Sequence, residues 1–492
     1  MSNPLKKLAG QTAIYGLSSI VGRFLNYLLT PLHTAKYSTD QYGVITEMYA
    51  YVAFLIILLT YGMETAYFRF SNKNKSEEAS VYSVILKSIA STSLMFIVLC
   101  SVFRVPIAEW LRYPNHSEYV VWFALIVGFD AISSIPLARL RSQEKPMRFA
   151  MVNLTNVLVN IALNLFFIAY CKVQYDQGNT NWLIDIFYNP TIGVGYVFIA
   201  NLVASIVKLI MLSPELWGAQ KAFDKKLLWT MVLYSSPLLI AGLAGMVNET
   251  LDRILLKYLL IDAIGEKATM SQLGIYGACY KVSIIITLFI QAFRYAAEPF
   301  FFSQKEEKDS RLVYAKVMNY FVGVCATIFL GVMLFLDLIK YFIPNPEYWV
   351  GLKVVPVLLL ANVCLGIYFN QSIWYKMTDK TSYGAYIAIG GALTTVALNL
   401  LLIPSLGYMG SAYATLVVYA LMVVSSYIFG QIHFPIPYNL FKVLGYVAGA
   451  ILIFWLGHYF QGKYPAAHWI IATTGVLGFI ASIILIEKKT TI

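Results

Sequence analysis

The sequence predicts an all-α polytopic membrane protein, and three observations support this fold class. Hydrophobic residues make up 59% of the 492-residue chain and charged residues only 12%, whereas a soluble protein carries about a quarter charged residues. The mean hydropathy is +0.67. Apolar stretches of about 20 residues, the length of a helix that crosses a ~30 Å hydrocarbon core, recur along the chain between short polar breaks. The alternating pattern of barrel strands does not occur.

The apolar stretches predict about fourteen transmembrane helices. They span residues 11–34, 43–66, 81–103, 118–138, 147–170, 191–212, 229–260, 274–301, 312–337, 350–375, 383–403, 408–430, 438–459 and 467–486. The basic N-terminus MSNPLKKLAGQT is not followed by a short apolar region with a small-residue cleavage site, so the first segment is expected to remain in the protein. The five cysteines occur singly, so we interpret them as small core residues and predict no metal site.

Lys and Arg residues gather in alternate loops. With the N-terminus in the cytoplasm, about 21 basic residues fall in the cytoplasmic loops and termini, against about 9 in the opposite loops. The net charge of +11 is therefore a topology signal rather than a nucleic-acid footprint, and no nucleic-acid partner is predicted. Both termini are expected to face the cytoplasm.

An internal repeat divides the chain. DQYGVITEMYAYV, which opens the second segment, matches LGIYGACYKVSII, which opens the eighth. The offset of 298 − 64 = 234 residues pairs Glu64 of YGMETAYFRF with Glu298 of FRYAAEPFFF. Asn164 in ALNLFFI is echoed by Asn399 in ALNLLLI, and each precedes a glycine-containing helix start, GVGY and YMGS. The repeat unit is about six helices long.

The repeat predicts two six-helix lobes, residues 1–220 and 221–432, followed by two further helices in residues 433–492. An even number of helices in each copy gives both lobes the same orientation, so a pseudo-twofold axis along the membrane normal should relate them. Two such bundles suit alternating access in a transporter. No loop exceeds about 20 residues and no GxxxxGK[ST] phosphate loop occurs, so we expect no enzyme activity and no ATP hydrolysis.

Charged side chains inside the bilayer are functional candidates, because burying them costs several kcal/mol unless they are paired or face water. Arg23 lies about halfway through the first segment with no acid within a helical turn. It is a candidate phosphate contact, since the planar guanidinium binds oxyanions through two hydrogen bonds; the alternative is a salt bridge to another helix. Arg253 has Glu249 and Asp252 beside it, which favours structural pairing. Lys281 lies inside the eighth segment.

Other charged residues are candidates for ion coupling or gating. Asp130, in LIVGFDAISSIP, has no base next to it in sequence, so it is either a protonation site or a hydrogen-bonded helix contact. Lys208 is expected to extend toward the cytoplasm. Glu64 and Glu298 lie near cytoplasmic helix ends, where they form either a gate or a permanent cap with bases such as Arg69 and Arg294. The gating and coupling candidates are Glu64, Asp130, Asp252 and Glu298.

A stripe of amides marks the fifth segment. Asn153, Asn156, Asn160 and Asn164 are spaced by 3, 4 and 4 residues, which places all four on one face of a helix. Such a stripe either lines a cavity and binds hydroxyl groups, as a sugar requires, or clamps neighbouring helices together. Asn164 has a repeat partner and is expected to be structural.

Several phrases resemble the bacterial polysaccharide flippase branch of the multidrug/oligosaccharidyl-lipid/polysaccharide exporter superfamily. They are KLAGQTAIYGLSSIVGRFLNYLLTPLHTAKYSTDQYG, YGMETAYFRF, LDRILLKYLL followed by LGIYGACYKV, QAFRYAAEPFFF, and LNLLLIPSLGYMGSAYATL. Their order and spacing cover nearly the whole chain.

The resemblance implies a multi-pass protein of the bacterial inner membrane. It would move an undecaprenyl-diphosphate-linked oligosaccharide from the cytoplasmic to the periplasmic leaflet for surface or exopolysaccharide biosynthesis. Cationic residues in a central cavity would receive the substrate, and helices 13 and 14 would form a lipid-tail groove beside membrane lipids. Polysaccharide polymerase machinery is an expected partner, and no cofactor is expected beyond an H⁺ or Na⁺ gradient. The substrate-binding candidates are Arg23, Arg253, Lys281, Arg294, Asn153, Asn156 and Asn160.

Two related functions and two unrelated ones compete with this interpretation. A peptidoglycan lipid-precursor flippase would also have fourteen helices, whereas an ion-coupled multidrug exporter would usually have twelve and an acid-dominated cavity. A membrane-embedded polymerase or glycosyltransferase would need a large extramembrane region. A structural scaffold would not explain paired lobes with buried charge. Buried acids and bases nearly balance in number, which leaves the sign of the cavity open.

Overall fold

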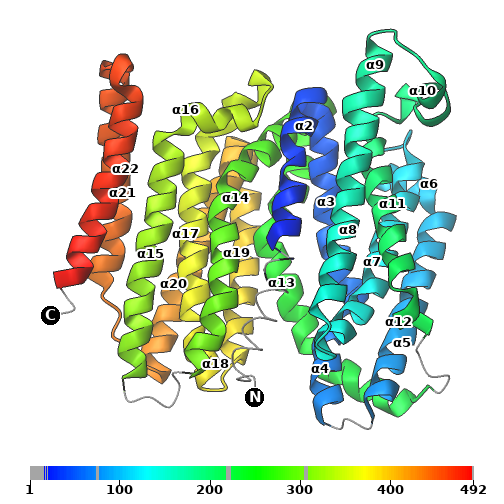
Figure 1. The fold of residues 1–492 in the computed structure, drawn as a ribbon, viewed down its shortest axis with the longest axis horizontal. Helices are drawn as coiled ribbons and strands as arrows, with labels where there is room; N and C mark the ends of the chain where they lie inside the picture. Colours follow the sequence, from blue (N-terminus) through cyan, green and yellow to red (C-terminus); the bar gives the residue numbers. More distant parts are fainter. Residues whose placement is uncertain are drawn as a thin grey trace. The chain divides into compact units, whose positions relative to one another are not determined.

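The computed structural model describes residues 20–73, 77–217, 223–303 and 309–489, together with Gly16 and Ser18. Within these ranges the regular structure is helical and contains no strand (Figure 1). Twelve helical stretches there are long and apolar enough to cross a membrane, and the helix Gly195–Met211 is shorter. These observations confirm an all-α multi-pass membrane protein. The N-terminal part of the first expected segment, 11–34, lies outside the described residues.

The described chain forms two compact units that divide between Ile254 and Leu255. In unit 1, a helical segment at residues 20–27 precedes the labelled elements. These are α2 (Leu29–Lys36), α3 (Thr39–Thr60), α4 (Met63–Lys73), α5 (Glu78–Val102), α6 (Arg104–Trp110), α7 (Ser117–Ser142), α8 (Pro146–Asn164), η2 (Leu165–Cys171), α9 (Lys172–Asp176), α10 (Trp182–Phe187), η3 (Pro190–Ile192), α11 (Gly195–Met211), α12 (Ser213–Trp217) and α13 (Lys225–Ile264) as far as Ile254.

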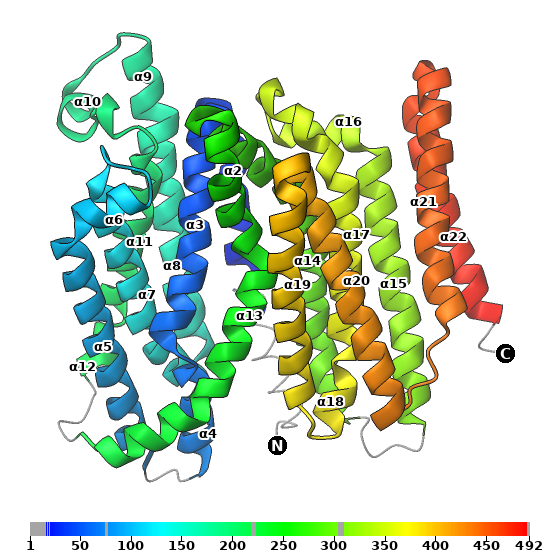
Figure 2. The ribbon, with the colours of Figure 1, turned by 180° about the vertical axis from the view of Figure 1, so that it is seen from behind.

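Unit 2 begins within α13. The division into compact units does not test the repeat boundary expected at residue 220, which stays a prediction. Its further elements are α14 (Glu266–Ser303), α15 (Ser310–Leu334), α16 (Leu336–Ile339), η4 (Lys340–Phe342), η5 (Pro346–Val354), α17 (Val355–Gln371), α18 (Ile373–Met377), α19 (Ser382–Leu406), α20 (Tyr408–His433), α21 (Leu440–Lys463), η6 (Pro465–Ala467) and α22 (His468–Lys489). Figure 2 shows the same helices from behind.

The second expected segment is two helices rather than one. Tyr61 and Gly62, between α3 and α4, have φ angles of 32° and 72°, a left-handed conformation that glycine adopts without steric cost. A Cβ atom on Gly62 would lie 3.1 Å from the backbone oxygen of Ser235 on α13. Tyr61 and Gly62 together end α3, and the absence of a side chain at Gly62 lets α13 approach closely.

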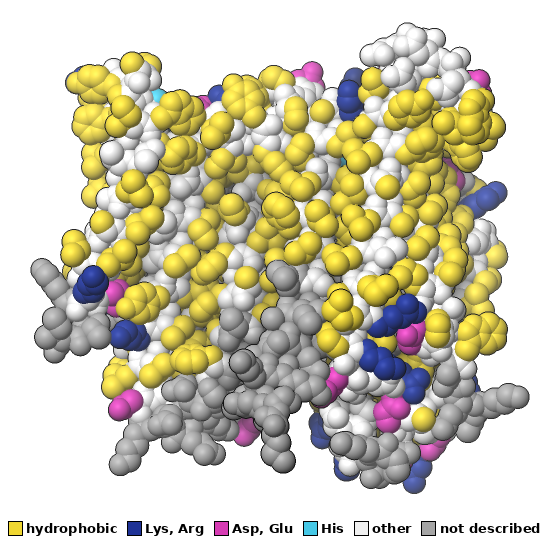
Figure 3. Space-filling model, viewed as in Figure 1, with side chains coloured by type: hydrophobic (Ala, Val, Ile, Leu, Met, Phe, Trp, Pro, Cys, Tyr) yellow, Lys and Arg dark blue, Asp and Glu magenta, His cyan; other side chains and the backbone are white. Residues whose placement is uncertain are grey.

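Apolar side chains cover most of the visible face at mid-height, as a lipid-facing surface requires (Figure 3). On unit 1, Lys and Arg side chains gather at the end that carries α4 and α12. This is the end that the loop charges assign to the cytoplasm, although the side of the membrane stays a prediction.

Two local features recur in the two units at points that the sequence repeat pairs. Asn164 and Asn399 are fully buried, and each Nδ2 donates to the carbonyl oxygen four residues earlier at 2.8 Å. Gly193 and Gly407, which precede α11 and α20, have φ angles of 54° and 57°, a conformation that favours glycine at both. The repeat therefore corresponds to shared local structure.

Candidate functional site

The predicted Arg23 and the amide stripe come together in unit 1. Residues 20–27 pack on α8, because a Cβ atom on Gly22 would lie 3.4 Å from Cγ2 of Val157. Arg23 and Asn26 are both exposed and, at i and i+3, share a face of their helical segment. Among the described residues, Arg23 forms no ion pair. A cationic side chain and an amide therefore stand beside the helix that carries the stripe.

Hydrogen bonds join this face to the interior of unit 1. Asn160 Nδ2 donates to Asn26 Oδ1 at 3.0 Å. Asn164 Nδ2 donates to the Asn160 side-chain oxygen at 3.1 Å as well as to its backbone oxygen. His33 Nε2 on α2 lies 2.8 Å from Asn164 Oδ1. Sequence reasoning missed Asn26 and His33, since a single amide or imidazole in an apolar helix forms no pattern. The one signal that could have found Asn26 is its spacing of three residues from Arg23, which places both on one helix face.

The rest of the stripe is less connected. Asn153 and Asn156 are half-buried on α8. The Nδ2 atom of Asn156 is buried and has no hydrogen-bond partner among the described residues. Since a buried donor without an acceptor is costly, this amide retains a capacity that a ligand hydroxyl could use.

The arginine in α13 differs from Arg23. Arg253 is only 8% exposed and Asp252 only 4%. The Arg253 guanidinium donates to the backbone oxygen of Glu249 at 2.6 Å and lies 3.5 Å from the Asp252 carboxylate. The expected link to Glu249 therefore uses its carbonyl, and Asp252 is a charged neighbour.

Asp130 does have a basic neighbour, which lies on another helix. Lys208 Nζ on α11 donates to Asp130 Oδ1 on α7 at 2.6 Å, and Ser205 Oγ donates to the same oxygen at 2.8 Å. Lys208 is 8% exposed, so the expectation that it extends toward the cytoplasm was wrong. The ion pair explains the burial, because a paired ammonium avoids the cost of an isolated charge.

Glu64 also pairs across helices. Its carboxylate lies 2.5 Å from Nη2 of Arg141 on α7. Arg69, the base nearest in sequence, instead lies over the ring of Tyr234, 4.1 Å from the centroid. The side chain of Glu298 lies outside the described residues, so the equivalent pairing in unit 2 stays a prediction.

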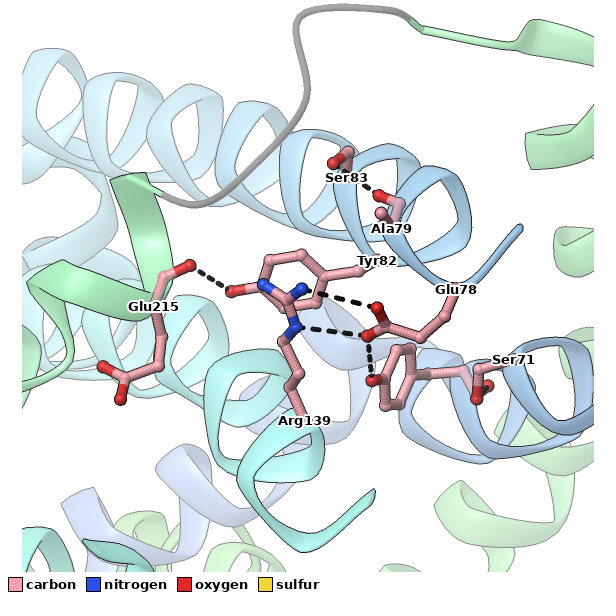
Figure 4. Close-up of polar contacts among 8 residues, drawn as sticks. Ser71, Glu78, Ala79, Tyr82, Ser83, Arg139 and Glu215 are labelled. Atoms are coloured by element: carbon pink, nitrogen blue, oxygen red, sulfur yellow. Dashed lines mark hydrogen bonds and ion pairs between the residues drawn. The ribbon is translucent and has the colours of Figure 1, made fainter. Parts of the chain in front are cut away.

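A second ion pair joins helices at the same end of unit 1 (Figure 4). Arg139 donates to both carboxylate oxygens of Glu78 at 3.1 and 3.4 Å and lies over the Tyr82 ring, 4.1 Å from its centroid. Tyr67 donates to Glu78 at 2.7 Å, and Tyr82 donates to the backbone oxygen of Glu215 on α12 at 2.7 Å. These contacts fasten α4, α5, α7 and α12 together.

The two basic candidates of unit 2 lie on the same helix. Lys281 and Arg294 on α14 are half-buried. The Arg294 guanidinium lies over the Phe369 ring, 4.4 Å from the centroid, and lines a small pocket with Asn370 and Lys376. This cation–π contact helps to hold the guanidinium in place.

The last two helices are joined at one end. Lys442 on α21 lies 2.9 Å from the Glu487 carboxylate on α22, and Tyr446 donates to the same carboxylate at 2.6 Å. Glu487 is 3% exposed. Large apolar side chains, including Phe441 and Trp455, are exposed along α21. The expected lipid-tail groove stays a prediction.

Comparisons with known proteins agree with this architecture. The chain is 20% identical over 427 residues to "Lsg locus putative protein 1" of Haemophilus influenzae, covering 82% of this chain and 95% of that protein. Its fold is similar to that of the lipid II flippase MurJ in an inward closed conformation, with a TM-score of 0.74, 12% identity and coverage of 96% and 99%. An inward-facing multidrug resistance MATE transporter of the MOP superfamily gives a TM-score of 0.60 at 12% identity, covering 86% and 94%.

The identities to the two solved structures are low, so these likenesses describe the fold alone. The family model of polysaccharide biosynthesis proteins matches residues 8–305, which is more than half of the chain. The chain therefore belongs to the polysaccharide biosynthesis protein family.

Proposed function

We propose that the protein is a flippase that moves an undecaprenyl-diphosphate-linked oligosaccharide from the cytoplasmic to the periplasmic leaflet of the bacterial inner membrane by alternating access. The observation that carries the proposal is the exposed Arg23 beside the amides of α8. Membership of a polysaccharide biosynthesis family supports the substrate class.

The chemistry of this face suits a lipid-linked oligosaccharide. An ionised side chain at mid-membrane depth is stable only if it faces water, a partner or a ligand, and Arg23 makes no ion pair with a described acid. A guanidinium matches phosphate oxygens. The amides of Asn153 and Asn156 both donate and accept, as sugar hydroxyls require. An organic cation would be repelled by Arg23, which disfavours the multidrug exporter.

Energy coupling is a second part of the proposal. We infer an H⁺ or Na⁺ gradient rather than a bound cofactor, with Asp130 as the coupling candidate in unit 1. Its ion pair with Lys208 joins α7 to α11, so a change at this pair could be transmitted between two helices of the unit. Any association with polysaccharide polymerase machinery is part of the same proposal.

Reconstitution in vesicles tests the function. The purified protein is placed in liposomes that carry a fluorescent undecaprenyl-diphosphate oligosaccharide, and a membrane-impermeant quencher reports its movement between leaflets, with and without an imposed ion gradient. We expect protein-dependent translocation. The peptidoglycan precursor lipid II and a fluorescent organic cation serve as competing substrates. Preferential movement of either one, with no movement of the oligosaccharide lipid, would refute the proposal.

A further inference from the structure

The hydrogen bonds of unit 1 fix the direction of a chain of amides. An asparagine side chain has a donating end and an accepting end. Asn164 Nδ2 faces the backbone oxygen of Asn160 at 2.8 Å, and a backbone oxygen only accepts. The donating end of Asn164 therefore points toward Asn160, and its accepting end points toward His33.

The same donor-to-acceptor orientation continues through the hydrogen-bonded amides to the exposed Asn26. Asn160 turns its Oδ1 toward Asn164 and its Nδ2 toward Asn26, whose Oδ1 accepts at 3.0 Å. The carbonyl of Asn26 is thereby engaged from the protein side, which leaves its Nδ2 group as the end exposed on the outer face. At the inner end, His33 must carry a hydrogen on Nε2, because it faces the accepting oxygen of Asn164.

The exposed end lies beside a second donor. Asn26 and Arg23 share one face of residues 20–27, and both are exposed. A guanidinium has five N–H donors and no acceptor, and Asn26 presents N–H donors outward. Two adjacent groups that only donate select a ligand that only accepts, and an ionised phosphate group is such a ligand.

We propose that Asn26 binds the same oxyanion as Arg23, and that Asn160, Asn164 and His33 are positioning residues that orient its amide. The inference deepens the proposed function, on which it rests for the source of the oxyanion, the diphosphate of a polyprenyl lipid. An amide held in one orientation binds more tightly than a freely rotating one, because its ordering cost is met before the ligand arrives.

Binding to the full-length protein in lipid nanodiscs tests the role of Asn26. The probes are geranylgeranyl diphosphate, inorganic pyrophosphate and the uncharged geranylgeraniol. We expect N26A to weaken geranylgeranyl diphosphate about 10- to 100-fold, the range for a lost hydrogen bond to a charged group, and to leave geranylgeraniol unchanged. N26D should weaken the diphosphate further, since it replaces a donor with a negative acceptor. An equal loss for geranylgeraniol, or no loss for the diphosphate, overturns the proposal.

The two phosphate probes separate the sources of the oxyanion. If the lipid is the ligand, geranylgeranyl diphosphate binds more tightly than pyrophosphate and both lose affinity in N26A. If pyrophosphate binds as tightly as the lipid, the site takes a free phosphate compound, and the assignment to a lipid diphosphate is wrong. Asn26 is exposed, so N26A should fold. N26S, with another small side chain, is a second variant in case N26A fails to fold.

A double-mutant cycle tests the positioning residues. In N160D the carboxylate still accepts from Asn164 but has no N–H for Asn26, so Asn26 should reverse and expose its carbonyl. We expect N160D to weaken diphosphate binding about 10-fold in the wild-type background and to have no further effect in N26A, since coupled residues are non-additive. An equal effect of N160D in both backgrounds would mean that its charge, not Asn26, carries the effect, and would overturn the positioning role.

His33 has its own matched pair of variants. Gln places a donor where Nε2 lies, whereas Met has a similar length and no donor. H33Q should retain diphosphate binding and H33M should lose it; equal binding by the two would refute the role of His33. If the vesicle assay shows no translocation but Asn26 and Asn160 remain coupled in diphosphate binding, the transport function alone is refuted. If translocation occurs but the coupling is absent, only the role of Asn26 in binding the oxyanion is refuted.

Discussion

Asn164 in unit 1 and Asn399 in unit 2 each donate a hydrogen bond to the backbone oxygen four residues earlier in their own helix. Their side-chain oxygens have different surroundings. The Oδ1 atom of Asn164 meets His33, and the chain continues through Asn160 to Asn26. The Oδ1 atom of Asn399 is buried and has no hydrogen-bond partner among the described residues. The repeat thus conserved a helix-stabilising amide, and only the copy in unit 1 became part of a polar network.

Other buried amides extend this contrast. In unit 2 a further set has a side-chain oxygen without a partner in the described chain: Gln272, Asn319, Asn370 and Gln371. Asn362 is bonded, since its Nδ2 donates to the backbone oxygen of Ser283. Unit 1 also has a buried amide nitrogen without a partner in the described chain, on Asn156, but Asn160 and Asp130 are each linked to another helix. Linked groups hold one geometry, so unit 1 is the better candidate for a preorganised binding surface.

The largest expected effect is the loss of transport in R23A. The variant removes an exposed guanidinium with no ion pair to a described acid, so folding should be unchanged while translocation in the vesicle assay falls at least about 100-fold, the range for a lost charged contact. R253A is the contrast, because Arg253 is buried and bonded to both the Glu249 carbonyl and Asp252, so its removal should cost about 3–5 kcal/mol of stability. Undiminished translocation by a folded R23A would remove Arg23 from the substrate site.

The next effect compares the two asparagines directly. N164L removes the partner of both His33 and Asn160 and should lower the free energy of unfolding by about 1–3 kcal/mol. N399L removes one intrahelical bond and an oxygen without a described partner, so the change should be within about 1 kcal/mol of zero. Thermal unfolding in detergent measures both. Equal losses would show that the unit 1 network adds no stability.

Two tyrosine hydroxyls make the same comparison at a smaller scale. Tyr67 donates to Glu78, whereas the buried hydroxyl of Tyr438 in unit 2 has no partner in the described chain. Y67F should therefore cost about 1 kcal/mol and Y438F close to nothing. A larger loss for Y438F would reverse the contrast between the units.

The smallest expected effect is an exposed pair in unit 2. Lys340 donates to Asp337 at 2.8 Å and holds the pKa of this carboxyl below its ordinary value, helped by nearby histidines and opposed by partial burial. A lowered folded pKa gives stability that is present above the unfolded pKa of about 3.9 and is lost as the pH falls through the folded value.

We therefore expect D337N to cost about 0.2–0.5 kcal/mol at pH 7, because the Asp337 side chain is 61% exposed. The difference from wild type should disappear in acid. Unfolding measured from pH 7 to pH 3 checks this, and a difference that grows toward low pH would contradict the sign.

Features that follow from sequence periodicity, such as helix positions and helix faces, could be predicted. The partners of charged side chains on other helices could not, because they depend on how the helices pack. Apolar length located the membrane helices, and helical spacing put Asn153, Asn156 and Asn160 on one face. The partner of Asp130 was missed because Lys208 lies 78 residues away, and nothing in either segment specifies which helix faces it. Glu64 was assigned to a base near it in sequence for the same reason, whereas the structure pairs it with Arg141.

The close contact between Gly62 and α13 has a consequence for the order of synthesis. Met231 of α13 is fully buried in the cluster that contains Met63, Ala66 and Tyr67, and Ser235 lies against Gly62. A nascent chain that has reached only Trp217 thus leaves that cluster uncovered. The N-terminal bundle therefore completes its core only after the first turns of α13, which follow Trp217 in the chain, have been synthesised.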